Sequence, residues 1–137
     1  VSLTDAILNA LPINVFVKDE KGRLIIANEM SAKTTGRPLA EIIGRTDDEL
    51  FPPEVAKRLL ADDARVRSAN QTLVREELLD DGRTLLARKC LVQVDGAELL
   101  LCVSMHVTDW KRANAFIASS PPLQQLFAEG TGLPTAI

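Results

Sequence analysis

Ser104 and His106 are the residues whose types and spacing come closest to hydrolytic chemistry. They stand two positions apart in an apolar run that reads as a strand, so their side chains share one face. A nucleophilic hydroxyl needs a base aimed at it, and two side chains in line on one strand do not supply that geometry. No Gly-x-Ser-x-Gly elbow or phosphate-binding loop accompanies them. The sequence therefore predicts that this segment is not an enzyme.

Other reactive side chains have simpler interpretations. Cys90 and Cys102 lack the spacing of a metal site and are interpreted as thiols in a reducing cytoplasm. Adjacent aspartates at 47–48, 62–63 and 80–81 are interpreted as helix caps and turns, and no metal site is predicted.

Composition excludes several partners. The 137 residues suffice for one domain, and the net charge of −3 without a basic stripe argues against nucleic acid. The apolar runs are too short to span a bilayer and no signal peptide is evident, so we expect a cytoplasmic location without membrane contact.

Periodicity predicts an α+β order in which helices separate two groups of strands. A first amphipathic helix ends at Pro12, a hairpin follows, and short helices lead to a longer one that begins near Pro53. The predicted strands are residues 14–18, 23–27, 72–79, 83–94 and 97–108. Asp81-Gly82 and Asp95-Gly96 are strong hairpin signals. We expect one five-stranded antiparallel sheet with the short helices on one face and flanking helices at both ends.

Several stretches in this order resemble the PAS domain, a bacterial sensory module. "FVKDEKGRLIIAN" is similar to the family's first hairpin, and "TTGRPLAEIIGRTDDELFPPEVA" to its short helices. "EELLDDGRTLLARKCLV" is similar to the stretch that carries the glutamate pair and lysine of one large PAS subgroup. "HVTDWK" is similar to the closing Asp-Ile-Thr-Glu-x-Lys motif, with His106 in place of the first Asp. The resemblance covers about residues 11–113.

The resemblance implies a PAS fold over residues 13–109, after a flanking helix at 1–12. An outgoing signalling helix is expected at 110–120, and residues 121–137 as a linker or the start of a further domain. The implied relay residues at the exit are His106, Thr108, Asp109, Trp110 and Lys111. Residues 53–69 hold no His for haem, and the Asn-Cys-Arg stretch of light-sensing flavin members is missing, so no cofactor is predicted.

The hairpin signals also predict which strand residues share a face. If both Asp-Gly pairs are two-residue loops, Glu76, Leu85, Lys89, Cys102 and Ser104 point inward together. Glu76 and Lys89 then stand diagonal to one another, as a structural ion pair or as contacts of a ligand whose anionic group meets Lys89. Asn28 adds hydrogen bonds, and the apolar wall is expected from Phe16, Ile26, Leu59 and Leu85.

Three functions remain open. The first is a sensory domain of a signalling protein (a histidine kinase, a cyclic-dinucleotide enzyme or a transcription regulator) that binds a small molecule, dimerises, or does both. Its homodimer would form through the terminal helices and the sheet face. The second is a ligand-free dimerisation scaffold. The third is a cone-fold isomerase, for which Glu76 is the one candidate acid.

Overall fold

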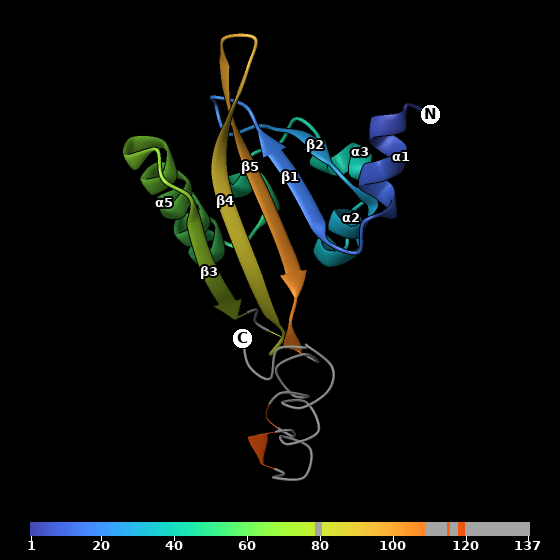
Figure 1. Cartoon of the computed structure of the whole chain (residues 1–137), viewed down its shortest axis with the longest axis vertical. Helices are drawn as coiled ribbons and strands as arrows, with labels where there is room; N and C mark the ends of the chain where they lie inside the picture. The colour runs from blue at the N-terminus through green and yellow to red at the C-terminus, as the bar shows by residue number, and fades with distance from the viewer. Residues whose placement is uncertain (79–80, 109–114, 116–117, 120–137) are drawn as a thin grey trace, which may run out of the picture. The chain divides into compact units, whose positions relative to one another are not determined.

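The computed structural model describes residues 1–78, 81–108, 115 and 118–119 (Figure 1). Its elements are α1 (Leu3–Ala10), β1 (Asn14–Lys18), β2 (Leu24–Ala27), α2 (Glu29–Thr35), α3 (Leu39–Ile42), α4 (Asp47–Leu50), α5 (Pro53–Ala69), β3 (Leu73–Leu78), β4 (Thr84–Val94) and β5 (Ala97–His106). The strands form one antiparallel sheet in the order β2-β1-β5-β4-β3. The predicted α+β architecture is confirmed.

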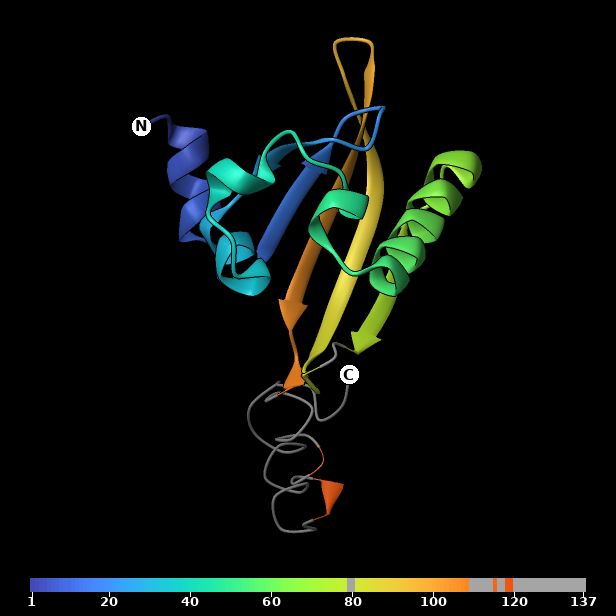
Figure 2. The ribbon, with the colours of Figure 1, turned by 180° about the vertical axis from the view of Figure 1, so that it is seen from behind.

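The chain divides into two units. The first comprises residues 1–77 and 86–105, and the second residues 78–85 and 106–137. In the first unit, α2, α3, α4 and α5 all lie on one side of the strands, behind them in Figure 1 and in front of them in Figure 2. Its core has two clusters, one built on Leu24, Ile42 and Leu50 and the other on Val66, Leu100 and Cys102. Phe16 packs against both.

Helix ends follow local chemistry. Ser2 caps α1 by accepting a hydrogen bond from the Asp5 amide, and Pro53 opens α5. Asn70 ends α5 in the left-handed conformation. The cap of α4 is Thr46, whose capping box with Glu49 leaves Asp47 free for another role. The prediction that the 47–48 pair provides a cap was wrong.

Asn28 holds three elements together. It caps α2, and its Oδ1 accepts from the amides of Val15 and Ser31. Its Nδ2 donates to the carbonyls of Leu8, in α1, and Ile13, just before β1, at 2.8 Å each. Because both amide protons are used, the side chain acts as a structural clamp.

The two Asp-Gly hairpin signals have different outcomes. Asp95 and Gly96 have φ of 48° and 81°, the pattern of a type I′ turn, and they join β4 directly to β5 as predicted. At Asp81–Gly82 only the glycine has positive φ, and the Asp81 carboxylate accepts from the Arg83 amide. Since β3 ends at Leu78 and β4 begins at Thr84, the connection exceeds two residues. The predicted two-residue loop was wrong here, and so was the face assigned to β3.

No helix within the described ranges is long and apolar enough to cross a membrane.

Candidate functional site

The candidate site lies on the side of the sheet that the helices cover. Asn14, Phe16 and Lys18 of β1 stand opposite Ser104, Cys102 and Leu100 of β5. Opposite residues of an antiparallel pair share a face, so these six side chains define the inner face. Lys89 of β4 joins them, because its ammonium reaches the same carboxylate as that of Lys18.

Four buried charges form what we call the charge cluster: Lys18, Asp47, Asp63 and Lys89. The Lys18 Nζ lies 2.5 Å from Asp47 Oδ2 and 2.5 Å from Asp63 Oδ2. The Lys89 Nζ lies 3.0 Å from Asp63 Oδ1, so Asp63 bridges the two lysines. All four side chains are at most 8% exposed. The cluster ties α4 and α5 to strands β1 and β4, and its two cations balance its two carboxylates.

Lys18 stays charged in this environment. Burial alone lowers the pKa of an ammonium, but the attraction of Asp47 and Asp63 outweighs burial and raises the pKa of Lys18 above its ordinary value. A lysine held protonated donates hydrogen bonds and is a poor nucleophile. In the charge cluster Lys18 therefore acts through charge attraction and hydrogen bonds rather than as a nucleophile.

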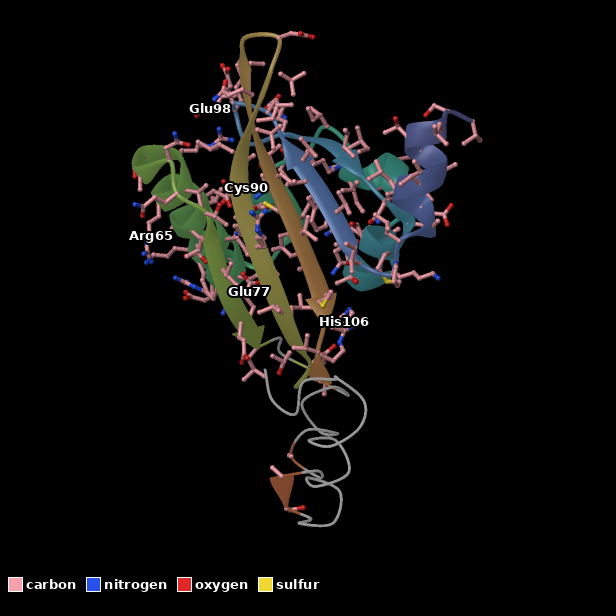
Figure 3. The ribbon with its side chains drawn as sticks, viewed as in Figure 1. Arg65, Glu77, Cys90, Glu98 and His106 are labelled. Carbon is pink, nitrogen blue, oxygen red and sulfur yellow. The ribbon has the colours of Figure 1, made fainter. Side chains whose placement is uncertain are left out.

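Cys102 lies beside the cluster on the inner face. Burial raises the pKa of its thiol to about 11, although Lys18 and Lys89 act in the opposite direction. The thiol is therefore neutral near pH 7 and unreactive. Cys90, half-buried on β4 (Figure 3), and Cys102 are both free.

A second polar group on the inner face involves Asn14. Its Nδ2 donates to Ser104 Oγ at 3.0 Å, and its Oδ1 accepts from Thr34 Oγ1 at 2.7 Å. Ser104 was predicted to contact a ligand, and the structure gives its hydroxyl an asparagine partner.

The other predicted pocket residues have mixed outcomes. Phe16, Lys89, Cys102 and Ser104 are together on the inner face, and Leu59 is half-buried on the face of α5 that carries Asp63. Leu85 is buried, but it belongs to the second unit.

Two assignments were wrong. Glu76 is exposed, because Arg75 and Glu77 take the inward positions of β3. The diagonal Glu76–Lys89 pair therefore does not form, and the acid required by the isomerase interpretation is on the wrong face. Ile26 stands opposite Val17, so it lies on the outer face rather than in the inner wall.

The residues that sequence reasoning missed are Asn14, Lys18, Asp47 and Asp63. A signal for Asp63 exists in the sequence, four residues after Leu59 and three before Val66 on the apolar stripe of α5. Lys18 alternates with Phe16 and Asn14 in the same way along β1. A charge at a core position predicts a buried partner of opposite sign.

The exit of β5 is held within the second unit. The Val107 amide donates to the Thr84 carbonyl at 3.0 Å, and the Thr84 amide donates to Thr108 Oγ1 at 2.7 Å. His106, the last residue of β5, is exposed (Figure 3). Asp109, Trp110 and Lys111, together with the predicted outgoing helix at 110–120, lie outside the described residues.

A family model described as the PAS fold matches residues 8–112. The chain belongs to the PAS-fold family. PAS domains are typically sensory, non-catalytic modules, which agrees with an inner face whose lysine is protonated and whose thiol is neutral. Within the described residues, no group of three or more His, Cys, Asp or Glu is placed to hold a metal ion.

The curated relatives are much longer than this chain. A diguanylate cyclase of Vibrio cholerae is 32% identical over 76 residues, which are 56% of this chain and 24% of that protein. An uncharacterized protein of Sinorhizobium fredii, y4lL, is 30% identical over 124 residues, 85% of this chain and 15% of that protein.

Solved PAS domains share the fold. The PAS domain of Bordetella pertussis BvgS has a TM-score of 0.67 at 15% identity, with 93% of this chain and 96% of that one covered. The PAS domain of the Cronobacter turicensis quorum-sensing receptor RpfR, solved in complex with BDSF, has a TM-score of 0.58 at 22% identity, with 72% and 96% covered.

Removal of Lys18 tests the charge cluster. Lys18→Met leaves Asp47 without its cation, and we expect the free energy of unfolding to fall by about 3–5 kcal/mol, measured by urea denaturation. Lys18→Met combined with Asp47→Asn relieves the orphaned charge and should recover part of this loss. Lys21→Met, at an exposed position, is the matched control. A double variant no more stable than the single one contradicts this account.

Alkaline pH tests Cys102. Its pKa is about 11 when folded against an ordinary 9.0, so above pH 9 the unfolded state releases this proton first. The stabilisation is complete below pH 9 and is lost as the pH rises to 11, with a slope of up to about 1.4 kcal/mol per pH unit. Cys102→Ala should flatten this slope in denaturation curves, whereas Cys90→Ala should keep it. Lys18, whose pKa is also raised, lowers the free energy of unfolding only above its ordinary pKa of about 10.4. The slope between pH 9 and pH 10 therefore reports on the Cys102 thiol.

Proposed function

We propose that this PAS domain is the cytoplasmic regulatory module of a bacterial signalling protein and that it works as a homodimer. Its parent protein is a histidine kinase, a cyclic-dinucleotide enzyme or a transcription regulator. The observation that carries the proposal is an apolar sheet face on the side of the strands opposite to the described helices α2–α5. The relationship to a diguanylate cyclase supports the cyclic-dinucleotide option.

The outer face of the sheet is rich in apolar side chains. It is defined by half-exposed residues of the central and neighbouring strands: Val17, Ile26, Leu99, Leu101 and Val103. More exposed members extend it, with Met105 at 42%, Val74 at 60% and Val92 at 37%. The helices α2–α5 lie on the opposite side of the strands (Figures 1 and 2). Contiguous apolar surface of this kind marks interaction sites, and a second copy supplies a matching apolar face.

Helix α1 offers a further apolar surface. Leu3 and Ile7 are 77% and 52% exposed, and none of its residues is buried. A helix with an unburied apolar stripe is stabilised when a partner covers it. We propose that α1 contributes to the same dimer.

The exit of β5 supports a relay role. Thr84 bonds both Val107 and Thr108, so the start of β4 and the end of β5 are fastened together where the chain leaves the sheet. A change in strand position would therefore be passed to the residues that follow Thr108. Such coupling requires two states that a signal binds differently.

A second candidate function is small-molecule sensing on the inner face. The specific observation is the amount of buried polarity there, which adds little to stability compared with an apolar core. The similar PAS domain of RpfR was solved in complex with BDSF, so this fold can hold a small molecule. If neither sensing nor relay operates, the remaining function is a dimerisation scaffold.

Leu101 tests the dimer interface. Leu101→Lys places a charge at the centre of the outer face, and we expect dimer affinity to fall by about thirtyfold or more. Native mass spectrometry and sedimentation equilibrium measure the oligomeric state. Ala61→Lys, on the exposed side of α5, is the matched control. A monomeric wild-type chain, or a variant that dimerises normally, contradicts the proposed interface. A mass released on denaturing the same sample would establish the sensing function.

Thr108 tests the relay. Thr108→Val removes the acceptor for the Thr84 amide while keeping the side-chain volume. We expect faster hydrogen exchange of the Thr84 amide, with the amides of β1 unchanged. Thr108→Ser retains a hydroxyl and should keep the protection. Equal protection in all three proteins would show that the bond does not fasten the strands.

A further inference from the structure

Glu77 is a buried carboxylate that the charge cluster does not explain. It takes an inward position on β3, by the alternation of burial along that strand, and is 8% exposed. Its Oε1 is the one fully buried side-chain nitrogen or oxygen atom, among the described residues, with no hydrogen-bond partner. A buried carboxylate oxygen without a partner has lost its hydration and gained no bond in return.

The other buried charges all have partners. Every other buried charge in the described ranges is paired, by the charge cluster or by the bond between Arg75 and Asp62 at 2.8 Å. Glu77 is therefore the one buried charge, among the described residues, that has no ion-pair partner.

We infer that Glu77 anchors a small-molecule site whose ligand carries a protonated amine or amidinium group. Such a group donates several hydrogen bonds and supplies a positive charge opposite the Glu77 carboxylate. The inference rests on the sensing candidate of the proposed function and names its ligand class. It also reverses the expectation of an anionic ligand at Lys89, since Asp63 already pairs that ammonium.

The position of Glu77 defines where the ligand lies. Arg75, two residues earlier on the same side of β3, reaches Asp62 of α5, so this side of the strand faces that helix. The Arg75–Asp62 pair thus lies on the same side of β3 as Glu77, two residues away along the strand. A divalent metal is a poor fit, because Ca²⁺ and Mg²⁺ take six or more oxygen ligands and Glu77 offers one carboxylate.

Glu77→Gln distinguishes a ligand anchor from a residue of the core. The variant keeps the shape and removes the charge, so without ligand its melting temperature should rise by several degrees. Agmatine and putrescine are the cationic probes and decanoate is the anionic one, each at matched ionic strength. Agmatine or putrescine should stabilise the wild type saturably, and Glu77→Gln should weaken that binding by about tenfold or more. Glu76→Gln, at the exposed neighbouring position, should leave the response to the cationic probes unchanged.

Three results would overturn the inference. Glu77→Gln could melt below the wild type, which would mean that the carboxylate has a favourable partner. If neither cation stabilises the wild type, or if decanoate stabilises it through Glu77, the proposed ligand class is excluded. Sedimentation of the same samples reads the dimer separately, so failure of this inference is distinguishable from failure of the regulatory dimer.

Discussion

The ion pairs of Lys18 with Asp47 and Asp63 are the constraint on which the first unit depends. A lysine at the end of a central strand must keep its charge where water is excluded, and only carboxylates from α4 and α5 make this possible. The positions of both helices are thus fixed by direction-dependent bonds as well as by apolar packing. Asp63 extends the constraint to β4, because its second oxygen holds Lys89.

The inner and outer faces of the sheet consequently have different chemistry. The inner face carries polar side chains, most of which have hydrogen-bond or ion-pair partners in the charge cluster or in the Asn14–Ser104 pair. The outer face has few polar side chains among the described residues, and helices α2–α5 lie on the other side of the strands. A module built in this way can respond on one side and associate on the other, and β5 contributes residues to both sides before it leaves the sheet.

The sequence predicted the architecture well because the residues that begin and end its helices and form its turns act locally. Pro53, Asn70 and the Asp95–Gly96 turn act through their own backbone preferences, which short-range patterns report. The face of β3 was predicted wrongly because a type I′ turn at Asp81–Gly82 requires a positive φ at Asp81, and this residue does not adopt it. A change of register by one residue turns every side chain of a strand to the other face of the sheet. The charge cluster was missed for another reason. Its partners lie 29, 45 and 26 positions apart in the chain, and only the tertiary fold brings them together.

The clamp made by Asn28 has a mechanical consequence for α1. One amide group bonds the carbonyls of Leu8 and Ile13, so the helix is fastened near its last turn while its first turn is free of buried contacts. Leu3 stands five residues from Leu8, about 7.5 Å along the helix axis, so a tilt about the fastened end displaces Leu3 the most. Helix α1 is therefore held near its C-terminal end by two asparagine side chains, Asn28 and its own Asn9, whose Oδ1 accepts from the Glu29 amide. The same Asn28 side chain bonds the start of β1, so the position of α1 and that of β1 are linked through it.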